Sequence, residues 1–212
     1  MLAAIQRQLR PPAAPAPTAG AEPLGCVEMR TYFASPGKLE ALHSRFRDHT
    51  CALFAKHGIT NLGYFSPLED DSDGGRLVYF IGAPSRAERD ASFAAFQEDP
   101  AWVEAKAASE VDGGLVARVD SVFLEATGYS AGLGPLARDG QLLELRRYAA
   151  ADGKGDALNA RFREGGPTWL RSGLTAVATL QRTPSEDTAP DGEVWLLIAH
   201  PSQPAAAAAY DR

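Results

Sequence analysis

The chain has 212 residues, of which 45% are hydrophobic and 23% charged, a composition typical of folded globular proteins. Its formal net charge is −6, and no cluster of basic residues supplies the cationic face that nucleic acid binding requires. No apolar run approaches the roughly 20 residues of a membrane-spanning helix. We therefore predict no nucleic acid partner, no membrane span and a cytoplasmic location.

The N-terminal segment, residues 1–24, is unlike the rest of the chain. Residues 10–17 are rich in proline and alanine, a composition that cannot supply a packed core. The apolar stretch at residues 1–5 is too short for a secretion signal. We predict a disordered or extended Pro/Ala-rich tail over residues 1–24.

A first folded unit is predicted over residues 25–128. A strand is expected at residues 26–33, and a helix comes after it. Two further strands are expected at residues 59–65 and 76–81, joined by an acidic turn. The apolar side chains of the helix recur at steps of three and four and form one stripe, made of Leu39, Leu42, Phe46, His49 and Leu53.

The second half of this unit contains two helix starts and a strand. Ser85 and Glu88 form a capping box that opens a helix. Asp99 is expected to cap a second, short helix with Pro100 at its first position. A fourth strand is expected at residues 118–126, whose side chains fall alternately on two faces. The order β-α-β-β-α-β is that of the ferredoxin-like fold.

The same pattern occurs twice. The motif Glu28-x-Arg30-x-Tyr32 recurs as Glu144-x-Arg146-x-Tyr148 at an offset of 116 residues, since 144 − 28 = 116. Internal repeats indicate repeated structural units, so we predict a linker at residues 129–141 and a second unit at residues 142–212. This second copy reaches residue 212 before its second helix is complete and before a fourth strand. Either the sequence is a fragment, or a partner or an exchanged strand completes the sheet.

A four-stranded sheet with helices on one face needs a cover for the other face. Two such sheets facing each other can close into a barrel with the helices outside. We therefore predict an α+β fold in which two tandem ferredoxin-like units form a dimeric α/β-barrel type arrangement, with the second unit incomplete. The units either close within one chain as a pseudo-dimer or pair with their counterparts in a homodimer.

Five short motifs of the first unit together resemble the NIPSNAP family: Glu28-x-Arg30-x-Tyr32, Pro36-Gly37-Lys38, Phe46-x-x-His49-Thr50, Lys56-His57-Gly58 and Asp99-Pro100-x-Trp102. The resemblance covers residues 25–128 and, as a truncated second copy, residues 142–212. It implies a dimeric α+β barrel, the superfold also used by antibiotic-biosynthesis-type monooxygenases, chlorite dismutase-like haem proteins and muconolactone isomerases. Family members generally lack an assigned reaction, and one superfold serves many functions.

Candidate ligand-binding residues are indicated by strand alternation, which places Glu28, Arg30 and Tyr32 on one face. If the opposite, apolar face meets the helices, this polar face lines the barrel, where Arg can bind an anion and Tyr can orient or protonate an oxygen. Alternatively, Glu28 and Arg30 form an internal ion pair, because a buried charge needs a partner regardless of function. The predicted ligand-binding residues are Glu28, Arg30, Tyr32, Glu144, Arg146 and Tyr148.

The catalytic candidates are Arg30, Tyr32 and His49. His49 could serve as a general base or a haem ligand, although a histidine on an apolar stripe is more often a satisfied core residue. His43, His49 and His57 are spaced six and eight residues apart, and no ligand cluster accompanies them. We predict no metal site and assign no cofactor.

Two functions remain open. The first is a NIPSNAP-type protein of unassigned activity, an α+β barrel that works through assembly or by capturing a small molecule. The alternative is a cofactor-independent monooxygenase or isomerase with its site inside the barrel. An enzyme needs a water-accessible cavity of roughly a few hundred Å³ lined by the catalytic candidates, whereas a scaffold can have a solidly packed barrel.

Overall fold

The computed structural model describes the chain at residues 3–6, 23–68, 72, 74–130, 133–137, 141–164, 175–183 and 192–208. The first unit has the predicted order of elements, and its first helix is a continuous run of three parts. Its elements are β2 (Cys26–Ala34), α1 (Leu39–Arg45), η1 (Phe46–Thr50), α2 (Cys51–Lys56), β3 (Thr60–Pro67), β4 (Arg76–Ala83), α3 (Arg86–Glu98), α4 (Pro100–Ser109) and β5 (Val116–Ala126).

The later part of the chain has the same order of elements as far as a second helix. Its elements are β6 (Leu142–Ala149), α5 (Gly155–Arg163), β7 (Thr175–Arg182), β8 (Glu193–His200) and α6 (Gln203–Ala208). One more strand, β1 (Ala3–Gln6), lies at the N-terminal end of the described chain.

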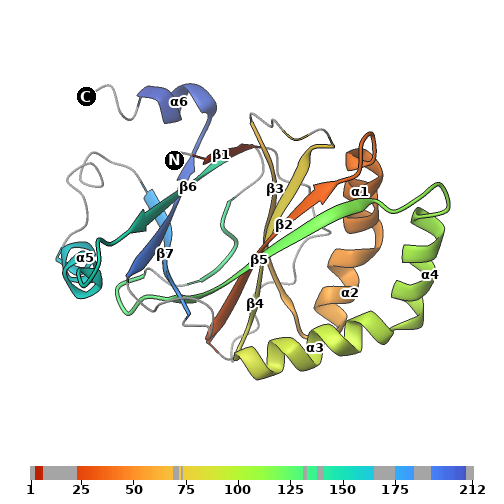
Figure 1. Ribbon diagram of the computed structural model, residues 1–212, viewed down its shortest axis with the longest axis horizontal. Helices are drawn as coiled ribbons and strands as arrows, with labels where there is room; N and C mark the ends of the chain where they lie inside the picture. Colours follow the sequence, from red (N-terminus) through yellow and green to blue (C-terminus); the bar gives the residue numbers. More distant parts are fainter. Residues whose placement is uncertain are drawn as a thin grey trace.

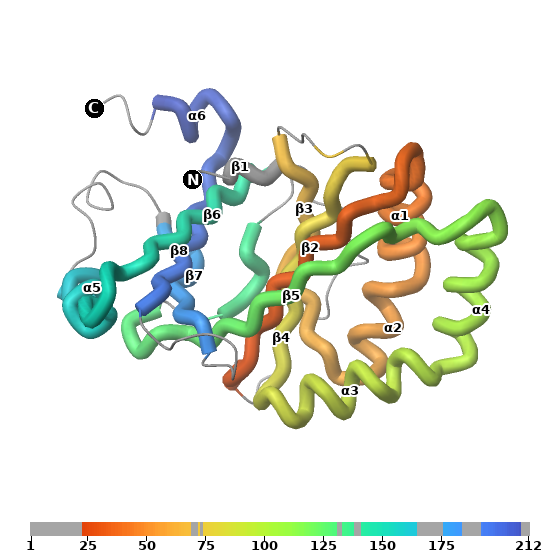
Figure 2. The backbone as a smooth tube through the Cα atoms, in the orientation of Figure 1, coloured from red at the N-terminus to blue at the C-terminus, as the bar shows by residue number. Residues whose placement is uncertain are grey.

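The strands form a single closed barrel, in the order β1-β3-β4-β2-β5-β7-β8-β6 around its wall. Every neighbouring pair is antiparallel. The helices from α1 to α4 lie together on one side of the barrel, and α5 lies on the opposite side (Figures 1 and 2). The predicted α+β barrel with helices outside is therefore confirmed. Within the described ranges, no helix is both long and apolar enough to cross a membrane.

β1 closes the ring between β3 and β6. Ile5 is the strand partner of Pro67 on one side and of Leu143 on the other. The prediction of a disordered tail is therefore wrong for Ala3–Gln6, because pairing with two strand edges orders a segment whose composition carries no such signal. Residues 7–22 of the predicted tail lie outside the described residues.

The helix after β2 contains a π-helical turn, η1, that changes which side chains are buried. A π-turn adds a residue to the helical repeat and rotates the next helical turn about the axis. Leu42, Phe46, Thr50 and Phe54 are consequently buried at steps of four. His49 is exposed, so its predicted place on the apolar stripe is wrong.

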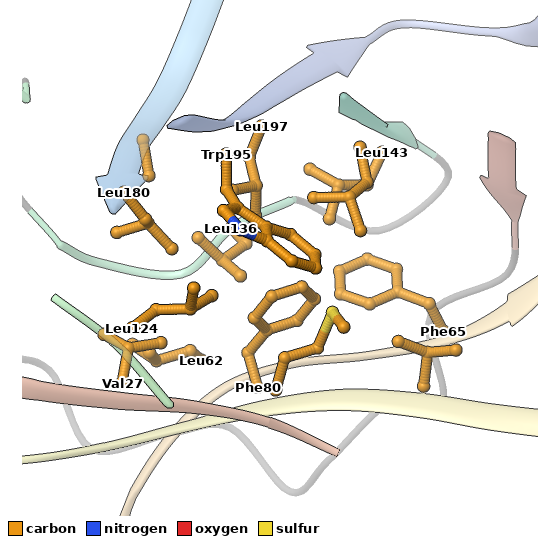
Figure 3. Packing of buried hydrophobic residues seen from close by; sticks show 14 of the residues in the cluster. Val27, Leu62, Phe65, Phe80, Leu124, Leu136, Leu143, Leu180, Trp195 and Leu197 are labelled. Atoms are coloured by element: carbon orange, nitrogen blue, oxygen red, sulfur yellow. The ribbon is translucent and has the colours of Figure 1, made fainter. Parts of the chain in front are cut away.

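Two main cores lie on opposite faces of the first sheet. One fills the barrel with residues from both halves of the chain, and Phe65, Phe80 and Trp195 meet in it (Figure 3). The other lies between the sheet and the helices from α1 to α4, and includes Phe54 and Tyr79. The barrel interior is thus packed with apolar side chains, as is usual for small barrels.

Both cysteines are unpaired and buried. Burial raises the pKa of the Cys51 thiol to about 11, and it also raises the pKa of Cys26. Because the thiolate is the reactive form, neither side chain is suited to nucleophilic chemistry at neutral pH.

Asp99 joins the end of α2 to the start of α4. As the predicted N-cap of α4, with Pro100 in its first turn, it accepts a hydrogen bond from Ala101 N–H at 2.9 Å. Its other carboxylate oxygen lies 2.6 Å from Lys56 Nζ and 2.7 Å from His57 Nε2. Two of the five sequence motifs therefore meet in space and hold the helical layer together.

Acidification is expected to weaken this junction. Hydrogen bonds from Lys56 and His57 hold the pKa of Asp99 well below its ordinary value. At acidic pH the unfolded chain binds a proton at Asp99 that the folded chain does not, so the stabilisation is complete above the ordinary carboxylate pKa and is lost progressively as the pH falls from there towards the lower pKa of the folded chain. In thermal unfolding we expect Asp99→Asn to reduce the uptake of protons on unfolding by about one at about pH 3 and to leave it unchanged at about pH 6.

The matched control for this prediction is Asp112→Asn, because Asp112 is exposed and lies just beyond α4. Its acid dependence should equal that of the original chain. An unchanged pH dependence in Asp99→Asn would contradict the proposed junction.

Candidate functional site

The polar face of β2 is turned toward the helices and not into the barrel. Val27 and Met29 belong to the barrel core, whereas Tyr32 packs in the helix-side core. Strand alternation places Glu28 and Arg30 with Tyr32. The predicted lining of the barrel by this polar face is therefore wrong. A closed barrel interior takes the more apolar face, and the helical side supplies the charged partner that Glu28 needs.

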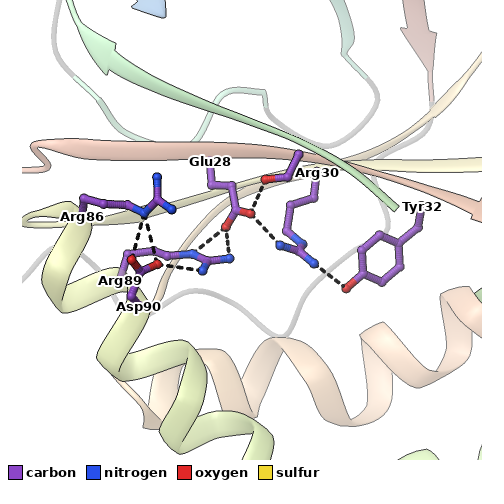
Figure 4. A network of polar contacts seen from close by, with 7 residues as sticks. Glu28, Arg30, Tyr32, Arg86, Arg89 and Asp90 are labelled. Carbon is purple, nitrogen blue, oxygen red and sulfur yellow. Dashed lines mark hydrogen bonds and ion pairs between the residues drawn. The ribbon is translucent and has the colours of Figure 1, made fainter. Parts of the chain in front are cut away.

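Glu28 is the centre of a buried polar network (Figure 4). Its side chain is 1% exposed. One carboxylate oxygen lies 2.5 Å from both Arg30 Nη1 and Ser121 Oγ, and the other accepts from Arg89 Nε at 2.7 Å. Arg89 comes from α3 and also bonds to the half-exposed Asp90 at 3.0 Å. The network thus ties β2 to β5 and to α3.

Arg30 and Tyr32 have the geometry of the internal alternative that the sequence left open. Arg30 Nη2 donates to Tyr32 Oη over 3.4 Å, and the guanidinium carbon lies 4.9 Å from the centroid of the Phe93 ring. Arg30 Nε has no hydrogen-bond partner in the described part of the chain. Arg30 therefore uses one N–H group for Glu28 and one for Tyr32, inside the protein.

A cavity of about 170 Å³ lies next to Tyr32, between the sheet and the helices. Its lining side chains come from β2, the three-part helix, α3, α4 and β5. Two of them, Phe46 and Thr50, belong to the π-helical turn, a feature often found at functional sites. The cavity walls are mainly aromatic: Tyr32, Phe46, Phe54, Phe93, Phe96 and Trp102.

Arg45 supplies the main buried charge at this cavity. The residue is 4% exposed, and its Nη1 donates to Glu110 Oε1 at 2.7 Å and to Ser109 Oγ at 3.2 Å. Partial burial raises the pKa of Glu110, but hydrogen bonds from Arg45 and Lys106 outweigh this effect and lower it. Arg45 Nε has no partner among the described residues. A charged donor therefore borders the cavity with one N–H group unused.

The second half of the chain holds a related polar cluster. Arg146 Nε donates to Glu144 Oε1 at 2.6 Å, and Arg146 Nη1 lies 3.5 Å from Tyr148 Oη. The other oxygen of Glu144 lies 2.7 Å from Nε2 of the buried His200. His200 thus takes the part that Arg89 plays for Glu28.

The structure brings some of the predicted site residues together and leaves others apart. Tyr32 lines the cavity and Arg30 contacts Tyr32, but His49 is exposed and is not among the lining residues. No group of three or more His, Cys, Asp or Glu side chains in the described ranges is placed to hold a metal ion.

Sequence reasoning missed Arg45, Arg89 and His200. The sequence did contain a signal for Arg45, because the dipeptide Arg45-Phe46 recurs as Arg161-Phe162 in the second copy of the repeat. Arg89 had none, since it lies 61 residues from Glu28 in the sequence. Contacts over such separations depend on how the sheet and α3 pack.

Comparison with known proteins identifies one part of the chain. Residues 27–131 match the NIPSNAP family model. An uncharacterised NIPSNAP-like domain protein from Burkholderia xenovorans is 22% identical, with 52% of this chain and 91% of that chain covered and a TM-score of 0.44. A NIPSNAP family protein from Agrobacterium tumefaciens is 23% identical, with coverages of 50% and 96% and a TM-score of 0.43.

A longer structural match covers both halves of the chain. A protein from Fusobacterium nucleatum, provisionally named a monooxygenase, has a TM-score of 0.56 at 9% identity, with 91% of this chain and 82% of that chain covered. This likeness concerns the fold alone. No curated protein matches the sequence.

Proposed function

Because the chain belongs to the NIPSNAP family through residues 27–131, we propose that it is a family member of unassigned activity that binds a small molecule between the sheet and the helices of its first unit. One observation carries this proposal. The aromatic cavity of about 170 Å³ is bordered by the buried Arg45, whose Nε has no partner in the described chain. An unpaired buried donor is costly unless something accepts from it.

The size and lining of the cavity favour a ligand with one aromatic ring. An apolar protein cavity of about 150 Å³ can hold benzene, and the volume here is similar. Aromatic walls can pack edge-to-face against such a ring. A carboxylate on the ring could accept from Arg45 in a charge-assisted hydrogen bond, which is stronger than a neutral one. The ligand class that we propose is a small aromatic acid.

Titration calorimetry with benzoate tests this site. We expect the original chain to bind benzoate with a dissociation constant of about 1 mM or lower, given the size of the ligand. Val116 lines the cavity, so Val116→Trp should fill it and weaken binding at least about tenfold. Toluene, which lacks the carboxylate, should bind more weakly than benzoate to the original chain.

Val119→Trp is the matched control, because Val119 lies on the same strand, is 42% exposed and does not line the cavity. It should bind benzoate as the original chain does. Undiminished benzoate binding by Val116→Trp, or equal losses in both variants, would count against the proposed site.

The proposal also includes the assembly. We propose that residues 142–212 form a second, truncated NIPSNAP-like unit after a linker at residues 129–141, and that the two units make an intramolecular pseudo-dimer. In support, both halves have the same order of elements and a Glu–Arg–Tyr contact. Strands of one chain also suffice to close the barrel. The cytoplasm remains the predicted location.

A second candidate is the cofactor-independent monooxygenase or isomerase. Its predicted site inside the barrel is filled by the apolar core, so an active site would have to use the helix-side cavity. There, Tyr32 is the catalytic candidate that lines the cavity, and its hydroxyl could orient or protonate an oxygen atom of the ligand. Incorporation of an oxygen atom into an added ligand, seen as a gain in its mass, would favour a monooxygenase, whereas a new product of unchanged mass in chromatography would favour an isomerase.

A further inference from the structure

The barrel wall has an internal two-fold correspondence. β3 and β7 each contain a register shift, between Asn61 and Gly63 and between Ala176 and Ala178. These shifts are 115 residues apart, since 176 − 61 = 115. β2 and β6 correspond at the repeat offset of 116 residues. β5 lies between β2 and β7, and β1 lies between β6 and β3. The correspondence therefore pairs β1 with β5.

The strand registers make this correspondence residue by residue. On β6, Leu145 pairs with Ala3 and Leu143 pairs with Ile5. The corresponding residues of β2, Met29 and Val27, pair with Val122 and Leu124 of β5. On β3, Pro67 pairs with Ile5 and Ser66 pairs with Gln6. The corresponding residues of β7, Arg182 and Gln181, pair with Leu124 and Glu125 of β5. The registers with the two neighbouring strands, β6 and β3, each place Ile5 at the position of Leu124, so two independent registers agree.

We propose that the edges of β3 and β6 form a strand-acceptor site and that Ala3–Gln6 of the same chain is its occupant, as the counterpart of β5. The N-terminal segment thus supplies the fourth strand of the second sheet from the other end of the sequence. Addition of a strand to open edges is a general mode of peptide recognition, in which main-chain hydrogen bonds provide the affinity.

The reach and the length of the segment fit this assignment. Residues 7–22 number 16, since 22 − 6 = 16, and can extend to about 50 Å, so the same chain can supply the strand. The contact comprises four residues, whereas β5 has 11. A short strand held by few hydrogen bonds opens more readily than the rest of a sheet. The site should therefore release its own strand and accept it again as a peptide.

Hydrogen exchange on a chain beginning at residue 23 tests the proposal. Amides of β6 at residues 143–145 should exchange at least about tenfold faster than in the full chain, because an uncovered strand edge opens locally. A synthetic peptide of residues 1–8 should restore the slow exchange. The same peptide with Ile5→Pro should not, because proline cannot donate to a strand ladder. Amides of β2 at residues 27–29, covered by β5, are the internal control.

If the shortened chain does not fold, Ile5→Pro in the full chain provides the same comparison. Unchanged exchange at residues 143–145 in both variants would overturn the proposal. A dimer of the full chain in native mass spectrometry that becomes a monomer on removal of residues 1–22 would also overturn it, because the strand would then be exchanged between copies. A monomer in both cases is the expected result.

Discussion

Replacing Glu28 with Gln is expected to destabilise the folded chain by about 3–5 kcal/mol, the usual cost of breaking a buried ion pair from one side. Glu28 is 1% exposed and compensates the charges of both Arg30 and Arg89, whose side chains are 14% and 12% exposed. The amide keeps the shape but removes the negative charge, so the largely buried Arg30 loses its carboxylate partner and Arg89 keeps only the half-exposed Asp90. Urea unfolding monitored by circular dichroism measures the loss.

Asp90→Asn is the matched control, because Asp90 contacts the same Arg89 but is 48% exposed. Exposed ion pairs contribute little, so its cost should stay below about 1 kcal/mol. Arg30→Met should cost about 1–3 kcal/mol, less than Glu28→Gln, since Glu28 keeps Arg89 and Ser121. If Glu28→Gln is no more damaging than Asp90→Asn, the network does not stabilise the fold as described.

Phe80→Ala is expected to cost about 3–5 kcal/mol in the free energy of unfolding, because it leaves a cavity in a fully packed core. Phe80 is 0% exposed and lies in the barrel core, where the centroid of its ring is 6.3 Å from the ring centroid of Phe65. Phe80→Leu should cost less, since it preserves more of the volume. The same urea unfolding experiment measures both variants.

Phe80→Ala also separates the two faces of the sheet. Phe80 belongs to the barrel core, whereas the candidate ligand cavity lies in the helical layer. The folded fraction of this variant should therefore bind benzoate with the affinity of the original chain. A large loss of benzoate affinity in the folded variant would indicate that the ligand site extends into the barrel.

The sequence by itself determined the order of elements and the family. These features can be recognised in the sequence without knowledge of tertiary contacts: the hydrophobic periodicity, the capping residues Ser85 and Asp99, and the internal repeat. The structure bears out the two caps. The comparison with known proteins bears out the family for residues 27–131.

The same kind of reasoning failed where a choice depended on packing. Alternation in β2 separates Val27 and Met29 from Glu28, Arg30 and Tyr32, but it does not say which set faces the helices. That choice depends on what packs against each face, and the partner that Glu28 meets on the helix side, Arg89 of α3, is distant in sequence. The predicted place of His49 on the apolar stripe was wrong for a related reason, because the spacing of apolar residues does not reveal the π-turn that moves His49 to the surface.

Local sequence determined which residues share a face and where elements begin and end, since short-range sterics and hydrogen bonds set both. Tertiary structure alone decided which face was buried in the barrel, where Arg45 met an aromatic cavity, and which segment closed the ring. Those outcomes depend on contacts between residues far apart in the chain. β1 is the clearest case, because Ala3–Gln6 forms a strand where two open edges lie beside it.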